Sequence, residues 1–520
     1  MNPSAFSLQP NLLLNNTVAV VETGLKDYPG TPPFDPPEVF PELERLPFRV
    51  GTDPGNRVYS GVRETLKLLG LDRERFGTRE WNPLGELIRP GNKVVIKPNF
   101  ALHYHRGGET PLSIVVHASV LRPLIDYAQL ALQGSGELLV ADAPVTDADW
   151  EKLIEVNRVR PMLEILNRSY PLRIGLRDLR RVVVSGYDQN NLFLDRRVQG
   201  YGARHTTIVN LGKHSAFYGL PPKIEKLYYG ADFDRRIPQA HHRGEIQEYS
   251  VAADILEADV VICVPKLKTH KTAGVTLSVK NIVGINTDKN FLPHYRIGEP
   301  RDGGDEYPDT GGQWLRWKGK LVRTAIDIGL GRLGSVVARP LNRLLNFYRR
   351  FSLGERAADP TIETADLVYK RLLGRRVRCG HWYGNDTLWR LGVDLNRVLL
   401  YADRDGVIHE TPRRSYLSLM DGIIAGEGKG PMVPDPRHVG VLIAGFNPLA
   451  VDRVAVGLMG FDEARLPIVA KVASAPGLSL GGSRPPEVCL VPGTDLPHLA
   501  PFEPAPNWKG HIERGMEQRA

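Results

Sequence analysis

The stretch VVICVPKLKTHKTAGVTLSVKNIVGI, residues 260–285, decides the fold of this chain. It opens with the apolar, mostly β-branched run Val260–Val264, and such a run is typical of a strand that is buried on both faces of a sheet. Pro265 ends the run, because proline has no N–H group to donate to a neighbouring strand. We therefore predict a central strand with polar residues just beyond its carboxyl end.

Basic side chains follow this strand. In an extended backbone alternate side chains share a face, so Lys266, Lys268 and His270 are expected to point the same way. Lys280-Asn281 then lies on a segment that can form a helix. Residues 261–298 hold five lysines, one arginine and two histidines but a single acid. Open α/β sheets bind ligands at the carboxyl ends of their strands, so this cluster predicts an anion-binding site.

The same junction of an apolar strand with polar residues recurs along the chain. Lys93–Ile96 leads into Lys97-Pro98-Asn99, and Glu137–Ala141 leads into Asp142. A helical pattern between these strands completes the βαβ arrangement of a parallel sheet. We therefore expect an α/β fold with a mostly parallel sheet and helices on both faces, plus small antiparallel and helical insertions. Further strands are expected at 17–21, 398–402, 439–445 and 487–491, and a glycine-rich loop at 421–431.

The order of these patterns predicts five segments. Residues 1–90 supply a strand, a loop and a helix that join the main domain. Residues 91–310 and 358–495 form the two halves of the α/β core. Between them, residues 311–357 interleave arginines with apolar residues, which predicts a helical insertion. Residues 496–520 are expected to be a loose tail.

Within the insertion, residues 315–355 have the pattern of one or two amphipathic basic helices. Such helices can form a solvated cap on the core. They can also contact a membrane surface or a partner protein.

Composition is ordinary for a globular protein, with 42% hydrophobic and 24% charged residues. The net charge of +8 favours anionic ligands, and no zinc-finger spacing or RNA-binding aromatic signature indicates a nucleic-acid partner. Three widely spaced cysteines form no CxxC pair and no disulfide framework. The sequence shows no signal-peptide pattern and no apolar run near the ~18 residues that span a bilayer. We expect a cytoplasmic protein without a transmembrane segment.

The lysines at strand ends are the main candidates for chemistry. A lysine ammonium binds phosphate or carboxylate oxygens, and its pKa falls when it is buried near other cations. Neighbouring lysines also lower the pKa of a histidine, which suits acid–base work. The expected catalytic residues are Lys266, Lys268, His270 and Lys280. The expected ligand-binding residues are Lys97, Asn99, Thr110 and Asn281, although Thr110 can instead cap the helix that follows it.

Two aspartates are candidates for a metal site. Carboxylate oxygens hold divalent cations, so Asp421 and Asp452 are expected to contribute to such a site, or one of them to act as a general base. Alternatively, Asp452 complements the dipole of its helix and Asp421 favours a turn beside Gly422. No HExxH or CxxC motif supports zinc, and GxSxG, P-loop and strand-linked GxGxxG motifs are missing. No cofactor other than a divalent metal is indicated.

Four motifs carry a resemblance to a known family. They are Val94–Asn99 (VVIKPN), Pro265–His270 (PKLKTH) with GVTLSVKN at 274–281, the glycine-rich stretch 421–431, and Asn447–Asp452 (NPLAVD) with Met459-Gly460. On these motifs the chain, from about residue 90 to 470, resembles the bacterial and archaeal "domain of unknown function 362" proteins. HWYGNDT at 381–387 resembles a signature of their longer members.

The resemblance implies an α/β domain whose reaction is not generally established. Some relatives carry a ferredoxin-like iron–sulfur domain, but this chain lacks the clustered cysteines for one. We therefore expect no iron–sulfur cluster on this chain. Relatives often have Asp-Pro where this chain has Asn447-Pro448, so a carboxylate is missing at that position.

Together these observations predict an enzyme that acts on a small anionic metabolite, a carboxylate or a phosphate. Its site is a lysine-rich cleft at the carboxyl ends of the strands, with possible assistance from a divalent metal. The reaction class does not follow from the residues. Two alternatives are a non-catalytic scaffold that binds a ligand or a protein in this cleft, and a redox protein fed by a separate iron–sulfur partner.

Overall fold

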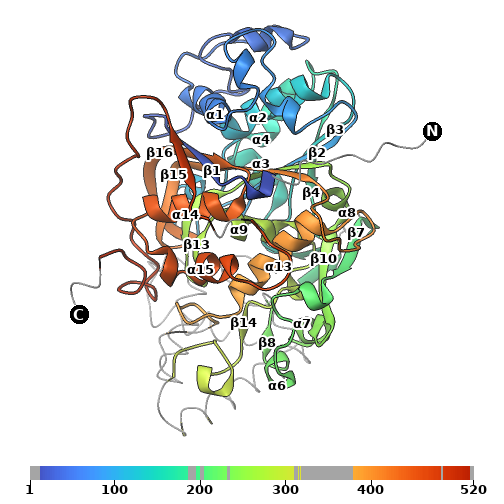
Figure 1. The fold of residues 1–520 in the computed structure, drawn as a ribbon, viewed down its shortest axis with the longest axis vertical. Coiled ribbons are helices and arrows are strands. Elements are labelled where there is room, and N and C mark those ends of the chain that lie inside the picture. The colour runs from blue at the N-terminus through green and yellow to red at the C-terminus, as the bar shows by residue number, and fades with distance from the viewer. Residues whose placement is uncertain are drawn as a thin grey trace.

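One large sheet dominates the computed structural model, which describes residues 12–185, 195–198, 204–230, 235–309, 314, 317, 377, 379–481 and 484–515. Among these residues, eight strands lie side by side in the order β17-β1-β16-β15-β11-β2-β3-β4 (Figure 1). Their bounds are Thr17–Glu22 (β1), Lys93–Pro98 (β2), Glu137–Asp142 (β3), Ile174–Asp178 (β4), Val260–Val264 (β11), Ser415–Lys429 (β15), Val433–Gly445 (β16) and Glu487–Leu490 (β17).

Most neighbouring strands in this sheet are parallel. The five strands from β15 to β4 run parallel to one another, whereas β16 is antiparallel to both β15 and β1. Two short strands, β12 (Lys266–His270) and β13 (Gly274–Thr276), branch from β15 beyond the end of β11. The prediction of an α/β fold with a mostly parallel sheet is confirmed.

Helices cover both faces of the sheet, and side chains alternate between two cores. Val260 and Ile262 pack with α1, α2 and α4, whereas Val261 and Cys263 pack with α13 and α14. Figure 1 shows the first group of helices on one side of the sheet and the second group on the other. Because alternate side chains of β11 face opposite sides of the sheet and both sides are apolar, the β11 run is apolar throughout. The helices are α1 (Arg57–Leu68), α2 (Ala118–Leu132), α3 (Trp150–Val156), α4 (Val159–Leu166), α6 (Pro222–Glu225), α7 (Arg236–His241), α8 (Ala253–Leu256), α9 (Ser278–Asn281), α13 (Leu388–Tyr401), α14 (Pro448–Leu458) and α15 (Pro467–Ala473).

Small antiparallel sheets make up the predicted insertions. One of these sheets has three strands in the order β7-β10-β9. Two more have two strands each, β14 with β8 and β5 with β6. Their bounds are Val182–Ser185 (β5), Asp195–Val198 (β6), Thr206–Asn210 (β7), Tyr228–Tyr229 (β8), His242–Arg243 (β9), Ile246–Ala252 (β10) and Tyr295–Arg296 (β14).

Two local predictions were wrong. The run 398–402 is not a strand, since residues 398–401 form the last turn of α13 and Ala402 is its C-cap; a short apolar run fits a buried helix as well as a strand. The stretch 421–431 is not a loop, since β15 continues through it to Lys429. Its glycines allow close backbone contact: a Cβ atom on Gly422 would lie 2.7 Å from the Val441 carbonyl oxygen of β16.

The two ends of the chain contribute to the same structure. β1 lies between β16 and β17, so the first and last strands complete one edge of the sheet. Residues 496–515, expected to be loose, instead bury Phe502, Trp508 and Ile512 in the core. The Trp508 indole N–H donates to the Lys271 carbonyl oxygen at 2.8 Å. The predicted Arg-rich insertion at 311–357 lies outside the described residues, apart from Trp314 and Trp317.

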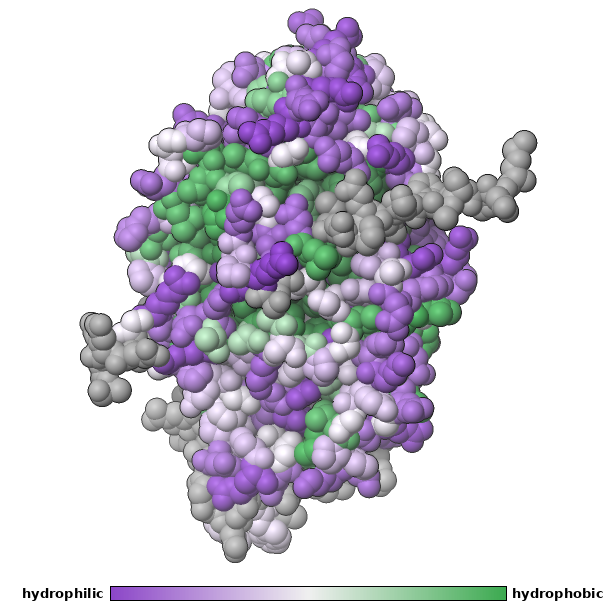
Figure 2. All heavy atoms as spheres, viewed as in Figure 1, coloured by the Kyte–Doolittle hydropathy of each residue, from purple (hydrophilic) through white to green (hydrophobic). Residues whose placement is uncertain are grey.

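The surface in the view of Figure 2 is mostly hydrophilic, with hydrophobic residues gathered over the region of the sheet. Within the described parts of the chain, every helix is too short or too polar to cross a bilayer.

Candidate anion-binding site

A cavity of about 450 Å³ lies where the polar residues after β2, β3 and β11 come together. Lys97 ends β2, Asp142 ends β3, and Lys268 and His270 come from β12, which follows β11. Lys280 reaches the cavity from α9. Neighbouring parallel strands end at the same edge of a sheet, so residues distant in sequence meet here.

The lining of this cavity is strongly basic. It contains six lysine or arginine side chains and two aspartates, an excess of four positive groups. Both acids are engaged, since Asp142 pairs with Lys97 and Asp147 pairs with Arg106. The remaining lysines therefore determine the electrostatic field of the cavity. They are Lys268, Lys271, Lys280 and Lys289.

The pair of Lys97 and Asp142 forms a buried base for the cavity. Lys97 Nζ lies 2.7 Å from Asp142 Oδ1, and it also donates to Asn281 Oδ1 at 3.1 Å. Asn99 Nδ2 donates to the same oxygen at 3.3 Å. The two amides, predicted as ligand-binding residues, thus orient Lys97. Gly284 packs so closely on the pair that its Cβ atom would lie 2.0 Å from Asp142 Oδ1.

Two polar oxygens at the cavity have neither a hydrogen bond nor an ion pair among the described residues. They are Asn99 Oδ1 and Thr276 Oγ1, both buried. Buried polar atoms are nearly always hydrogen-bonded in folded proteins. A ligand or solvent in the cavity would supply the partners that these atoms lack.

Lys268 and Lys289 are held in place by backbone carbonyls. Lys268 Nζ donates to the Ile114 carbonyl at 2.8 Å, and Lys289 Nζ donates to the carbonyls of Val283 and Asn286 at 3.1 and 2.9 Å. Burial, with the nearby charge of Lys97, lowers the pKa of Lys289 to about 7. Burial and two neighbouring lysines lower the pKa of Lys268 well below its ordinary value.

Lys280 is the central cation of the cluster. It lines the same cavity as Lys268, His270, Lys289 and His294, and its charge lowers the pKa of all four. Burial, together with Lys97, lowers the pKa of Lys280 to about 8. Unlike Lys268 and Lys289, its ammonium group has no hydrogen bond or ion pair within the described part of the chain.

Two of the three histidines that line the cavity, His270 and His294, have opposite hydrogen-bonding roles. His270 Nδ1 accepts from the backbone N–H groups of Thr272 and Ala273 at 3.0 and 3.1 Å, so a neutral ring carries its proton on Nε2. His294 Nδ1 lies 2.8 Å from the Leu292 carbonyl oxygen and must donate to it, which leaves Nε2 unprotonated. Burial lowers the pKa of both rings, that of His294 to about 4. His270 is therefore a donor, and His294 is the ring that can accept a proton.

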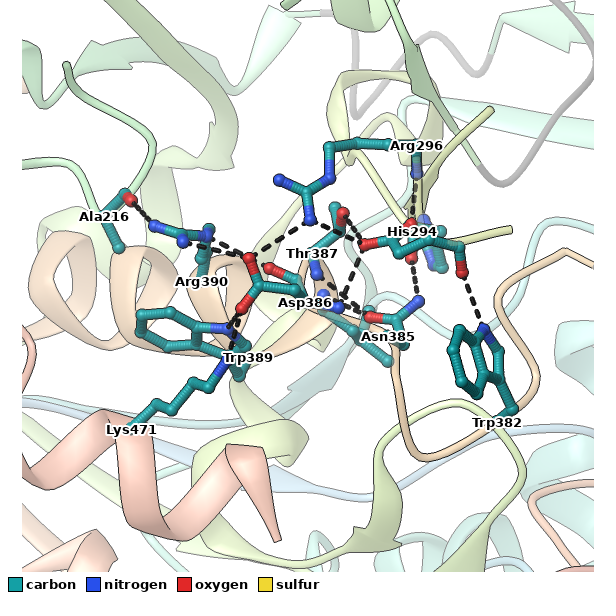
Figure 3. A network of polar contacts seen from close by, with 12 residues as sticks. Ala216, His294, Arg296, Trp382, Asn385, Asp386, Thr387, Trp389, Arg390 and Lys471 are labelled. Carbon is teal, nitrogen blue, oxygen red and sulfur yellow. Dashed lines mark hydrogen bonds and ion pairs between the residues drawn. The ribbon is translucent and has the colours of Figure 1, made fainter. Parts of the chain in front are cut away.

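The HWYGNDT segment holds one wall of the cavity against β14 (Figure 3). Asn385 Nδ2 donates to the His294 carbonyl at 3.0 Å, and the Trp382 indole donates to the Asp305 carbonyl at 2.9 Å. His381, at the start of this segment, and Cys379 just before it line the cavity. The motif that resembles a signature of longer relatives thus has a structural role at the site.

Asp386 is the centre of the network in Figure 3. Its carboxylate accepts from Arg296 and Arg390 at 3.1 Å each and from the Trp389 indole at 2.9 Å, and Lys471 also contacts it. Burial alone would raise the pKa of Asp386, but Arg390 and Lys471 outweigh it and hold the pKa well below its usual range. The carboxylate therefore stays ionised and fixes the segment to its neighbours.

Lys266 does not line the cavity, contrary to the expectation that it faces the same way as Lys268 and His270. Lys266 Nζ pairs with Asp421 at 3.0 Å, and the Tyr28 hydroxyl donates to the same carboxylate at 2.7 Å. The pairing of β12 with β15 is irregular here, since Lys266 lies opposite Asp421 but Lys268 lies opposite Gly426. Lys266 and Asp421 thus form a separate buried pair.

Thr110 and Asp452 also lie outside the cavity lining. Thr110 Oγ1 accepts from the Leu112 N–H at 3.3 Å and caps a short 3₁₀ helix, Pro111–Ser113. Asp452 accepts from the N–H groups of Ser278 and Val279 at 2.7 and 3.0 Å. Asp421 and Asp452 serve different networks and do not form one metal site. Across the described ranges, no group of three or more His, Cys, Asp or Glu side chains has the geometry to hold a metal ion.

Several residues of the cavity were not among the predicted site residues. Lys289 and His294 belong to the basic stretch 261–298, and its excess of positive charge could have identified both as site residues. His381 starts the HWYGNDT motif. Thr276 and Gly284 have no signal in one sequence, because their roles depend on atoms that come close only in the folded chain.

Comparison with known proteins adds a family and one short match. The model of the family described as "Domain of unknown function (DUF362)" matches residues 200–457. A 54-residue segment is 46% identical to a thylakoid-associated protein of Synechocystis sp., and it covers 10% of this chain and 17% of that protein. The family match includes Lys268, His270, Lys280, Lys289 and His294.

Proposed function

The chain belongs to the domain of unknown function 362 family, and we propose that it is an enzyme that binds and transforms a small anionic metabolite in the lysine-rich cavity. The ligand carries a carboxylate or a phosphate group. The observation that carries this proposal is the excess of four basic side chains in a cavity whose two acids are already paired. Lysine ammonium groups bind such oxyanions directly.

The cavity also supports proton transfer. His270 offers an N–H donor from Nε2, whereas His294 offers an unprotonated Nε2. Lys280 and Lys289, with pKa values of about 8 and 7, exchange protons near neutral pH. Groups with shifted pKa values gathered in one cavity favour an active site over a purely structural cluster. This favours the enzyme over a non-catalytic scaffold.

We also propose that the protein is cytoplasmic. All three cysteines are free thiols, and Cys263 is fully buried in the sheet. Free thiols suit a reducing compartment. The similarity to a thylakoid-associated protein covers only 54 residues, so a peripheral membrane location is the alternative that cell fractionation would reveal.

The test is a thermal-shift screen with small carboxylates and phosphates, followed by an NMR assay of turnover for each compound that stabilises the protein. We expect stabilisation by anions but not by their neutral amide or alcohol analogues. Lys268→Met and Lys280→Met should lose the response, whereas Lys223→Met, on the exposed helix α6, should keep it. Stabilisation by anions without turnover would favour the scaffold function. No response to any anion would contradict the proposal.

A further inference from the structure

Lys280 differs from Lys97, Lys268 and Lys289 in how its amine is placed. Lys97 is paired with Asp142, and Lys268 and Lys289 donate to backbone carbonyls. Each of these amines is committed to a protein acceptor. Lys280 lines the cavity with no such acceptor in the described residues, and its side chain is partly exposed there. A bound molecule can therefore approach its amine directly.

The surroundings of Lys280 also favour its neutral form. Removing a charged amine from water and placing it near other cations both disfavour the ammonium ion. Burial and Lys97 have this effect and lower the pKa of Lys280 to about 8. A neutral lysine amine is a nucleophile, and lysines beside another cationic group are activated in this way.

A proton acceptor lies in the same cluster. His294 Nε2 is unprotonated because Nδ1 donates to the Leu292 carbonyl. His294 and Lys280 line the same cavity, and the charge of Lys280 lowers the pKa of His294. The cavity thus combines a free amine, a base, and lysines that can hold an anionic group.

We propose that Lys280 attacks the carbonyl carbon of a 2-oxo acid or a phosphorylated ketone or aldehyde and forms a covalent imine. This rests on the proposed function, because the carboxylate or phosphate of the substrate is held by the same lysines. The imine proposal further requires that the substrate carry a carbonyl group.

The step is a condensation that releases water. The lone pair of Lys280 Nζ forms a bond to the carbonyl carbon while the electrons of the C=O π bond move to oxygen. One proton leaves the nitrogen, goes to His294 Nε2 and then to that oxygen, which gives a carbinolamine. The second amine proton follows the same route as the nitrogen lone pair forms the C=N bond and the C–O bond breaks, so the oxygen leaves with two protons as water and a neutral imine remains. No oxidant, reductant or further reactant is needed.

Borohydride trapping tests this directly. Full-length protein is incubated with pyruvate or dihydroxyacetone phosphate, sodium borohydride is added to reduce any imine, and the modified lysine is located by peptide mass spectrometry. We expect labelling at Lys280 at least about tenfold above that at the exposed Lys223, since the neutral fraction of an ordinary lysine is far smaller. Labelling should rise with pH through about 8.

Lys280→Arg keeps the positive charge and removes the nucleophile. We expect this variant to lose the label and still to bind lactate and glycerol phosphate, which have the anionic group but no carbonyl. Lys223→Arg should be labelled like the wild type. The position of the label on the wild-type protein tests the proposal even if the Lys280→Arg variant does not fold.

The outcomes separate the two proposals. If lactate or glycerol phosphate binds but no adduct appears at Lys280 with either carbonyl probe, the imine is wrong and the anion site stands. The same conclusion follows if Lys280 is labelled no more than Lys223. If neither anion binds and no adduct forms, both proposals fail.

Discussion

Lys97 Nζ lies 2.7 Å from Asp142 Oδ1, and both side chains are buried at the ends of adjacent parallel strands. The pair lines the cavity and neutralises its most buried lysine. The basic character of the site therefore comes from the lysines of β12, α9 and the segment that follows. This arrangement leads to the predictions below.

Asp142→Asn should destabilise the fold. It removes the negative charge beside a lysine that is 0% exposed, and breaking a buried pair by removing one partner costs about 3–5 kcal/mol. Urea unfolding followed by circular dichroism measures the change. The double variant Lys97→Met with Asp142→Leu should recover much of the loss, because no buried charge remains. An Asp142→Asn protein as stable as the wild type would contradict this description of the pair.

Gly284→Ala should disturb the base of the cavity. The new Cβ atom would lie 2.0 Å from Asp142 Oδ1 and 2.5 Å from Lys97 Nζ, so the segment must move. Overpacking of this kind costs about 1–3 kcal/mol, and anion affinity should fall with it. Gly30→Ala is the matched control, since no atom lies within 4 Å of its Cβ position. Equal melting temperatures for the two variants would show that the contact is not tight.

The lysines of the cavity should make stability rise with pH above about 7. Lys289 in the folded protein has a pKa of about 7, whereas in the unfolded chain it keeps its proton up to about 10.4. Between these values the unfolded state binds more protons, so the free energy of unfolding increases with pH. Between pH 7 and 9, Lys289→Met should reduce this increase by roughly 2 kcal/mol. Urea titrations at both pH values test this, and an unchanged slope would contradict it.

Asp386→Ala should loosen the wall that carries His381. It leaves Arg296, Arg390 and Lys471 without their shared carboxylate. Loss of a partly buried acceptor for charged donors costs about 1–3 kcal/mol. We expect faster hydrogen exchange at residues 379–387 and weaker anion binding. Glu44→Ala, which removes an exposed pair with Arg79, should change neither quantity.

The sequence predicted the central part of the fold well. β1, β2, β3, β11 and β17 lie where apolar runs between turn signals placed them. Periodicity could not separate helix from strand at 398–402, because VLLYA is apolar at every position and becomes the end of α13. The prediction of a loop at 421–431 was based on its glycines. In the structure these glycines allow the close pairing of β15 with β16.

The candidate site was predicted in part. Lys97, Asn99, Lys268, His270, Lys280 and Asn281 do meet in one place. Lys266 does not, because it pairs with Asp421 of β15, and an alternating pattern does not show such a long-range contact. The separate roles of His270 and His294 also could not be read, since they depend on which backbone groups contact Nδ1.

Isothermal titration calorimetry with sulfate tests the central claim most directly, because sulfate keeps its charge throughout the neutral pH range and has no carbonyl group. We expect the wild-type protein to bind sulfate at a single site. Lys280→Met should weaken binding by about tenfold or more, as the loss of one charge-assisted contact implies, whereas Lys223→Met should bind like the wild type. Equal affinity for wild type and Lys280→Met, or no sulfate binding at pH 6 to 7, would contradict an anion site in this cavity.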